Sequence, residues 1–205
     1  MHDPLAEIRR VLVDRYGCHT VLLYGSRAHG TPTVGSDWDV LGVREKGETV
    51  REVREIGDAW LDAFIHPEAH FDTLDEGALR FHGAKVLVDA RGYASKLLVR
   101  VAELERRGPP PLRADEESTL RAWFPKMLER IGRDDVEARY RRAWLLVDAL
   151  EAWFHLRGKF YRGPKQSFAW LKEHEPAVHA AFERALAPGA TQDDLTALVS
   201  CVLSG

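Results

Sequence analysis

Apolar and polar positions alternate differently in the two halves of the chain. In the first half, short apolar runs between glycine-containing turns are typical of β-strands. These strands are expected at about 20–24, 38–43, 59–65 and 85–89. Apolar residues spaced three and four apart predict helices over about 5–12 and 93–107. The first half is therefore expected to be an α/β domain.

After residue 115, all the apolar spacing is helical. Helices are expected at about 115–131, 140–154, 167–174, 176–186 and 191–203. Pro125 predicts a kink in the first of these, and Thr191 with Asp194 predicts a cap on the last. The proline run Pro109–Pro111 cannot continue a helix and predicts a stiff linker. We therefore predict an α/β domain over 1–108, a Pro-rich linker over 109–114 and an all-α helical bundle over 115–205.

The long helix near 140–154 carries a wide apolar stripe. Its members are Tyr140, Ala143, Trp144, Val147, Leu150 and Phe154. Aromatic side chains at helical spacing usually bury against a core. Trp144 and Trp153 are accordingly interpreted as packing residues rather than as stacking platforms for nucleic-acid bases.

Two aspartates lie one residue apart where the second apolar run begins. Side chains at i and i+2 of a strand share one face, so Asp37 and Asp39 are expected to point the same way. Two adjacent carboxylates repel each other unless a cation lies between them. Ligands that are all oxygen favour a hard ion such as Mg²⁺. The pair therefore indicates metal-assisted transfer to or from a phosphate.

A Gly-Ser pair follows the first strand. Gly25 permits a turn and close backbone approach, and Ser26 stands where a helix could begin. Exposed N–H groups and a hydroxyl at such a point suit the phosphates of a nucleotide, and Arg27 adds a charged donor. The alternative is an ordinary turn followed by a solvated strand start. The combination of four residue types, fixed spacing and strand–turn–strand context favours the functional interpretation.

Gly25-Ser26, ten intervening residues, Asp37-Trp38-Asp39 and then apolar Val40-Leu41 resemble the signature of the DNA polymerase β-type nucleotidyltransferase superfamily. The resemblance is specific over about residues 20–90. It implies a small mixed sheet flanked by helices. It also implies transfer of a nucleoside monophosphate from an NTP to an acceptor hydroxyl, with release of pyrophosphate. Two Mg²⁺ ions held by three carboxylates are implied as cofactors.

The third carboxylate is expected to be Asp62. Apolar and other residues alternate around it from Trp60 to Ile65, and an ionised group within such a strand is costly unless paired or metal-bound. The resemblance implies that this residue shares the catalytic metal and takes the proton of the attacking hydroxyl. Asp58 and Asp72 are rival candidates, and a strand-edge aspartate facing water is the alternative.

The helical half contains a basic segment. Between Arg139 and Lys172 eight Lys/Arg stand against two acids, and Gly158, Gly163 and Pro164 interrupt the helices there. Cations of this kind could stabilise charge developing on pyrophosphate. The segment is similar to the helical domain of antibiotic-type nucleotidyltransferases, which implies that Lys165 reaches the nucleotide phosphates. The alternative is a solvated basic helix face.

Composition narrows the class of protein only slightly. The chain has 205 residues, no apolar run long enough for a membrane span and no signal-peptide pattern at its start. Two distant cysteines, Cys18 and Cys201, are expected to be reduced thiols of a cytoplasmic protein. A net charge of −3 argues against an extended nucleic-acid surface. His66 and His70 offer no third zinc ligand, and Pro67 between them disfavours a helix.

Three functions remain open on the sequence. The first is a magnesium-dependent enzyme that transfers a nucleotide, with ATP as the expected donor, to a small-molecule hydroxyl, resembling the aminoglycoside and lincosamide adenylyltransferases. The second is an antitoxin-like enzyme that adds AMP to a partner protein. The third is a non-catalytic nucleotide-binding protein of the same fold. The expected metal ligands are Asp37, Asp39 and Asp62, and the nucleotide is expected to contact Gly25, Ser26, Arg27 and Lys165.

Overall fold

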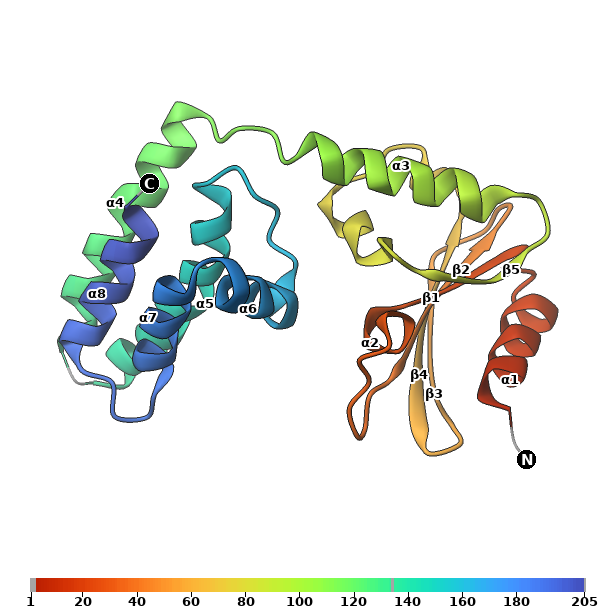
Figure 1. Ribbon diagram of the computed structural model, residues 1–205, viewed down its shortest axis with the longest axis horizontal. Helices are drawn as coiled ribbons and strands as arrows, with labels where there is room; N and C mark the ends of the chain where they lie inside the picture. The colour runs from red at the N-terminus through yellow and green to blue at the C-terminus, as the bar shows by residue number, and fades with distance from the viewer. Residues whose placement is uncertain (1–2, 134, 205) are drawn as a thin grey trace. The chain divides into compact units, whose positions relative to one another are not determined.

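The computed structural model describes residues 3–133 and 135–204. The chain divides into two compact units, Met1–Arg107 and Gly108–Gly205. Residues 108–113, which include the proline run, lie outside helices and strands. Figure 1 shows strands in the first unit and helices in the second.

The N-terminal unit is built on a mixed five-stranded sheet of order β3-β4-β2-β1-β5 (Figure 1). The strands are β1 (Thr20–Tyr24), β2 (Trp38–Arg44), β3 (Val50–Ile56), β4 (Ala59–Pro67) and β5 (Lys85–Asp89). β2 and β4 run parallel, whereas the pairs β1–β2, β1–β5 and β3–β4 are antiparallel. Four of the strands match the predicted runs, and β3 was not predicted.

Helices and helical turns connect and cover these strands. They are α1 (Pro4–Arg10), the π-helical turn η1 (Val11–Arg15), α2 (Gly25–His29), the 3-10 turns η2 (Glu68–Phe71) and η3 (Glu76–Phe81), and α3 (Tyr93–Arg107). Asp3 caps α1 by accepting the N–H groups of Leu5 and Ala6. The helix predicted over 93–107 is confirmed by α3.

The two faces of the sheet bury different side chains. On one face, Ile8 and Leu12 from the first helix and η1 pack against Val21, Val40 and Ala63 of three strands. Because successive strand residues point to opposite faces, Tyr24, Asp39 and Asp62 must share the other face. On that second face the ring of Tyr24 packs edge-on against Phe81 of η3 at 5.1 Å. The carboxylates therefore lie on the face that η3 partly covers.

The C-terminal unit consists of packed helices. They are α4 (Ala114–Ile131), α5 (Val136–His155), α6 (Gly163–His174), α7 (Pro176–Leu186) and α8 (Gln192–Leu203). Their core contains Phe124, Trp153, Leu171, Phe182 and Leu198. α4 continues through Pro125, the position of the predicted kink, without being broken there.

A predicted cap and a predicted packing residue in this unit are confirmed. Thr191 and Asp194 form a capping box at the start of α8, with Thr191 N–H donating to Asp194 Oδ2 at 2.9 Å. Trp153 is 1% exposed. Trp153 is therefore part of the core, as predicted from its helical spacing.

The predicted stripe of α5 is only half correct. Leu150 and Phe154 are buried, but Tyr140 and Val147 are exposed and Trp144 is about half exposed. The helix buries instead the neighbouring face that carries Leu145, Ala149 and Trp153, which leaves the more N-terminal part of the stripe on the surface. α5 is thus apolar on two sides.

None of the helices formed by residues 3–133 and 135–204 combines the length and the apolar character required to cross a membrane.

Candidate functional site

The strand register places two predicted carboxylates side by side. Asp39 of β2 is the direct partner of Tyr24 on β1 and of Asp62 on β4. Neighbouring strands lie about 4.8 Å apart, and direct partners in a parallel pair point to the same face. Asp39 and Asp62 are therefore adjacent acids on one face of the sheet.

The rival carboxylates take other positions. Asp58 is exposed in the turn between β3 and β4. Asp72 follows η2, and its backbone carbonyl accepts a hydrogen bond from Arg100 at 2.9 Å. Only Asp62 of these three lies opposite Asp39 in the sheet.

Asp37 lies just outside β2, in the exposed loop that follows α2. Arg27 of α2 fastens this loop. Its Nε lies 3.1 Å from both the Ser36 and the Asp37 carbonyl oxygens, and its Nη2 donates to Ser36 at 2.7 Å. Its guanidinium also stacks over Trp38, 4.0 Å from the ring centroid. In this structure Arg27 therefore orders the chain that carries Asp37.

Gly25 is required by its position next to Asp39. Its φ of +70° lies in the left-handed region, where a side chain is strained. A Cβ on residue 25 would lie 2.2 Å from Oδ2 of Asp39, far inside van der Waals contact. The turn after β1 can approach the carboxylate so closely because glycine has no side chain. Ser26 follows in the first turn of α2, which ends at Gly30 with φ of +75°.

An arginine that we did not predict binds Asp62. Arg51 of β3 donates from Nε to Asp62 Oδ1 at 2.8 Å and from Nη2 to Oδ2 at 2.7 Å. This two-pronged contact is the strongest geometry that an arginine and a carboxylate can form. The hydrogen bonds to Asp62 raise the pKa of the Arg51 guanidinium. The positive charge of Arg51 offsets the repulsion between the two neighbouring acids.

Tyr24 and Arg80 complete this face. Burial raises the pKa of Tyr24 to about 12; nearby Arg80 opposes the shift, and Asp39 and Asp62 add to it. The phenol is therefore protonated at neutral pH. Arg80, from η3, is fixed by its hydrogen bond to the Gly77 carbonyl at 2.9 Å and lies 5.5 Å from the centroid of Phe64. Arg51 is thus bonded to one of the carboxylates, and Arg80 lies near Tyr24 and Phe64 on the same face.

His66, further along the same face of β4, is a structural residue. Its ring stacks on His70 at 3.8 Å, and its Nδ1 lies 3.0 Å from Thr49 Oγ1. Burial, followed by the charges of His70 and Arg80, lowers the pKa of His66 to about 4. The imidazole is neutral at physiological pH and packs against its neighbours.

The carboxylates of Asp39 and Asp62 suit a hard cation, although they do not form a complete metal site. Among residues 3–133 and 135–204, no three His, Cys, Asp or Glu side chains are already gathered closely enough to hold a metal ion. Asp39 and Asp62 nevertheless offer adjacent carboxylate oxygens, the ligands that Mg²⁺ prefers. Asp62 would have to share or exchange its bonds to Arg51.

Lys165 lies in the first turn of α6, in the C-terminal unit. Several other cations of the basic segment have structural tasks. Arg157 donates to the carbonyls of Trp153, Cys201 and Val202, each at 3.1 Å, and so ties α5 to the end of α8. Lys159 lies over the ring of Trp170 at 4.9 Å. The basic segment is therefore in part a packing feature.

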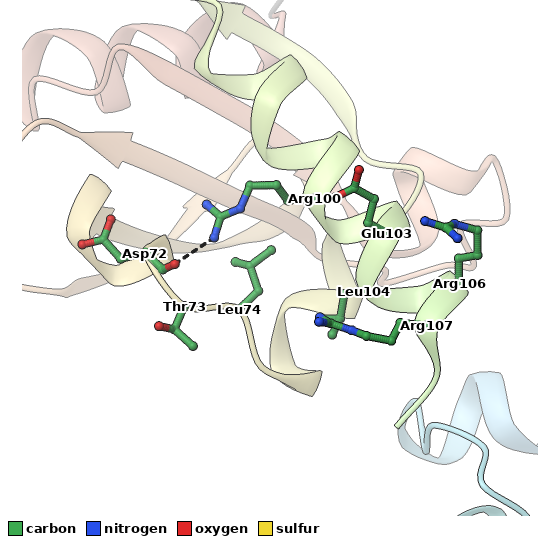
Figure 2. Close-up of a pocket in the computed structure, with 8 residues that line it drawn as sticks. All are labelled: Asp72, Thr73, Leu74, Arg100, Glu103, Leu104, Arg106 and Arg107. Atoms are coloured by element: carbon green, nitrogen blue, oxygen red, sulfur yellow. Dashed lines mark hydrogen bonds between the residues drawn. The ribbon is translucent and has the colours of Figure 1, made fainter. Parts of the chain in front are cut away.

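A separate pocket of about 560 Å³ lies along the C-terminal half of α3 (Figure 2). Its lining residues are Asp72, Thr73, Leu74, Arg100, Glu103, Leu104, Arg106 and Arg107. Figure 2 shows Arg100 reaching from the helix to the Asp72 carbonyl. Neither Asp39 nor Asp62 lines this pocket, so it is distinct from the carboxylate pair.

Comparison with known proteins finds a distant likeness in structure and none in sequence. No protein-family model matches the chain, and no curated protein matches it in sequence. A solved structure to which it is similar is a nucleotidyltransferase-like protein from Exiguobacterium sibiricum 255-15, with 10% sequence identity and a TM-score of 0.45. The similarity covers 96% of this chain and 72% of that chain. At this level the likeness says nothing about substrates or activity.

Proposed function

We propose that this chain is a magnesium-dependent nucleotidyltransferase. It would move a nucleoside monophosphate from an NTP, with ATP as the expected donor, to a hydroxyl of a small-molecule acceptor and release pyrophosphate. The observation that carries the proposal is the register that sets Asp39 beside Asp62, with the backbone of Gly25 against Asp39. Two adjacent carboxylates on one sheet face offer the oxygen ligands that Mg²⁺ prefers.

The oxygen ligands for magnesium would come from Asp37, Asp39 and Asp62. When bound, Mg²⁺ neutralises charge on the phosphates and orients them for in-line displacement. Asp39 and Asp62 fit this task because their strands are hydrogen-bonded neighbours with both residues on one face. The loop tether formed by Arg27 would keep Asp37 within reach of them.

Asp62 is the general base in this proposal. It would accept the proton of the acceptor hydroxyl as the hydroxyl oxygen bonds to the α-phosphorus of the NTP. The bond between that phosphorus and the bridging oxygen breaks in the same displacement, and pyrophosphate leaves with the electron pair. The fork from Arg51 holds the Asp62 carboxylate in one orientation before the acceptor arrives.

The β- and γ-phosphates would be held at the turn after β1. Gly25 leaves room for them at the backbone, and the Ser26 hydroxyl and neighbouring N–H groups supply donors. Arg27 would act on the nucleotide through the loop that it orders. Lys165 would contribute a cation from the helical unit to the leaving pyrophosphate.

The test is a nucleotidyl-transfer assay on the full chain. Labelled NTPs and Mg²⁺ are supplied with aminoglycosides, lincosamides and other hydroxyl compounds, and pyrophosphate and labelled product are measured. We expect Asp39→Ala to lower turnover by roughly a thousandfold or more while the fold is kept. We expect Asp62→Asn to lose transfer but to keep most of its NTP affinity.

Asp58→Asn is the matched control, because it removes an exposed carboxylate from the adjacent turn. It should leave turnover unchanged. Near wild-type turnover in Asp39→Ala would contradict the site assignment. Transfer of label to protein rather than to a small molecule would favour the protein-modifying enzyme. NTP binding without any transfer would favour the non-catalytic function.

The contribution of Lys165 is tested by titration. Lys165→Ala should weaken NTP binding about tenfold, which corresponds to about 1.4 kcal/mol. Lys172→Ala, later on the same helix, is the control and should bind NTP like the wild type. Equal affinities in the two variants would assign Lys165 to an ordinary solvated helix face.

A further inference from the structure

One row of side chains crosses the sheet on the face of the carboxylates. Tyr24 of β1 is the direct partner of Asp39 on β2. Asp39 is the partner of Asp62 on β4, and Asp62 in turn is the partner of Val53 on β3. Direct partners on neighbouring strands share a face, so these side chains follow one another across the sheet. The turn at Gly25, which is the proposed phosphate site, lies at the β1 end of this row, and Val53 lies at the other end.

In-line displacement determines which end of the row the acceptor approaches. The attacking oxygen and the leaving oxygen lie on opposite sides of the phosphorus. With the pyrophosphate at Gly25, an acceptor hydroxyl bonded to Asp62 therefore approaches from the side of β3. Because β3 is the edge strand on that side, the atoms attached to the hydroxyl lie over Val53 and its neighbours.

Apolar side chains are exposed at this end of the row. Val53 is 53% exposed. Trp60, two residues before Asp62 and therefore on the same face of β4, is 50% exposed. Trp60 also lies at the end of β4 that is next to the start of β2, since Leu61 pairs with Trp38. An acceptor bonded to Asp62 can therefore bury apolar surface against both Val53 and Trp60.

The charge beside Asp62 disfavours a cationic acceptor. Arg51 holds both carboxylate oxygens of Asp62, at 2.8 and 2.7 Å. An ammonium group next to the reacting hydroxyl would be repelled by this guanidinium and would compete with it for Asp62. Arg80, over the ring of Phe64, and Glu55 have opposite charges and lie one row to either side of Asp62. The nearest charge to the reacting hydroxyl, apart from the carboxylates, is thus that of Arg51.

We propose that the acceptor is an uncharged hydroxyl compound with an apolar face beside its reacting hydroxyl, and that Val53 and Trp60 bind this face. The inference rests on the nucleotidyl transfer proposed above and selects among its acceptors. In the transfer, the hydroxyl proton passes to Asp62, the hydroxyl oxygen bonds to the α-phosphorus, and pyrophosphate leaves with the electron pair of the broken bond. A compound with an ammonium group on the neighbouring carbon is a poor acceptor for this site.

Three simple alcohols test the acceptor class on the full chain with labelled ATP and Mg²⁺. Propanol and ethanolamine are equal in size and differ in a terminal methyl or ammonium group, and benzyl alcohol carries a ring beside its hydroxyl. We expect kcat/KM to be about tenfold higher for benzyl alcohol than for propanol, because the ring buries additional apolar area. Ethanolamine should be at least about tenfold poorer than propanol, because its ammonium group approaches Arg51.

Two variants test the apolar side chains. Val53→Ser and Trp60→Ala should each raise the KM for benzyl alcohol about five- to tenfold and leave the KM for ATP unchanged. Val86→Ser is the matched control for the first, because Val86 is 46% exposed on β5, the opposite edge of the same sheet. Trp144→Ala, at a tryptophan of α5 that is 48% exposed, is the control for the second. Both controls should keep the wild-type values, and circular dichroism checks that each variant is folded.

Binding is measured separately from turnover by saturation-transfer NMR with benzyl alcohol in the absence of nucleotide. The wild type should give a transfer signal, and Val53→Ser should give a weaker one than Val86→Ser. The Asp39→Ala chain, which is expected to be inactive, should still bind benzyl alcohol. These signals do not require nucleotidyl transfer to take place.

The possible failures are distinguishable. Equal kcat/KM for propanol and ethanolamine would overturn the inference and leave the proposed function intact. A higher KM for ATP in Trp60→Ala would also overturn it, because the indole would then contact the nucleotide. If benzyl alcohol does not bind the wild type, another part of the chain or another molecule covers Val53 and Trp60, and the inference is wrong. Binding that depends on Val53, without transfer to any alcohol, would instead contradict the proposed function and leave a binding site for uncharged alcohols.

Discussion

The two ends of β1 both carry polar and ionisable side chains, but these differ in how far they are exposed to solvent. At the Thr20 end, His19 Nε2 lies 2.9 Å from Glu68 Oε1, and His19 Nδ1 lies 3.0 Å from Thr20 Oγ1. The Thr20 hydroxyl in turn donates to Asp89 Oδ1 at 3.5 Å, and the same oxygen accepts the Ala94 N–H at 3.2 Å. At the Tyr24 end, Asp39 and Asp62 lie on a partly exposed face where an arginine covers one of them.

Residue types alone would favour the Thr20 end over the candidate site. A histidine between a glutamate and a threonine, with an aspartate behind, looks like a proton relay. However, Thr20 is fully buried, so no substrate reaches its hydroxyl. Each group there is bonded to another, and the network holds η2, β5 and α3 to the strand. The Tyr24 end has simpler groups, but its carboxylates are partly exposed. Solvent exposure, rather than residue type, therefore distinguishes the candidate site from the structural cluster around Thr20.

The largest expected effect that would sharpen this contrast is at Gly25. In Gly25→Ala the new methyl group meets Asp39 Oδ2 and also forces a side chain into a positive φ. We expect turnover to fall at least about a hundredfold and stability to fall by about 1–2 kcal/mol. Steady-state kinetics and urea unfolding measure the two losses separately.

Gly30→Ala is the control for this variant. Its φ is also positive, but no atom lies within 4 Å of the position of the new Cβ. It should therefore lose stability from backbone strain and keep its turnover. If both variants lose turnover equally, the contact between Gly25 and Asp39 has no special role.

The second effect concerns His66. This residue lies on the same sheet face as the candidate site, but it is buried, like Thr20 at the other end of β1. Its folded pKa of about 4 is below the value of about 6.5 for an unfolded histidine, so the unfolded chain binds the extra proton. Stability should be fully present above pH 6.5 and fall as the pH drops from 6.5 to 4. The loss from this residue approaches about 3 kcal/mol at the lower limit.

Denaturant unfolding across that pH range measures this loss, with His66→Gln as the variant that cannot titrate. The glutamine can retain a hydrogen bond to Thr49, and its stability should depend less on pH by the stated amount. His29→Gln, at an exposed position, should follow the wild-type curve. A wild-type curve that is parallel to that of His66→Gln would show that His66 titrates normally.

The smallest expected effect is at the Thr20 end of β1. Thr20→Val keeps the shape of the side chain but leaves His19 Nδ1 and Asp89 without the hydroxyl. We expect a loss of about 1–2 kcal/mol in the free energy of unfolding and unchanged turnover per folded molecule. Thr196→Val, at an exposed position of α8, is the control and should change stability less. A selective loss of turnover in Thr20→Val would mean that the Thr20 end of β1 takes part in catalysis.

Periodicity in the sequence was sufficient to predict most elements. The strands at 20–24 and 85–89 have the predicted bounds because each is a compact apolar run between turns. β3 was missed because its sequence, Val50–Ile56, places charged residues on both faces of an edge strand. Such a strand exposes one side to water, so an alternating apolar pattern is not required.

The carboxylates could be proposed from spacing because i and i+2 residues share a strand face. Arg51 and Arg80 could not, because their contacts with the site face depend on the pairing of β3 with β4 and on the position of η3. No local pattern encodes either arrangement. For the same reason Tyr140 and Val147 were predicted to be buried: helical spacing defines a stripe but does not tell which neighbour covers it.

The fork between Arg51 and Asp62 has a consequence for how the molecule is assembled. In many small metalloproteins the ligands repel one another until the ion arrives, so the polypeptide folds only around its metal. Here a guanidinium on the sheet's own edge strand already balances one of the two neighbouring acids. The proposed ion is therefore not needed for folding, and stripping divalent ions with a chelator should leave the melting temperature nearly unchanged.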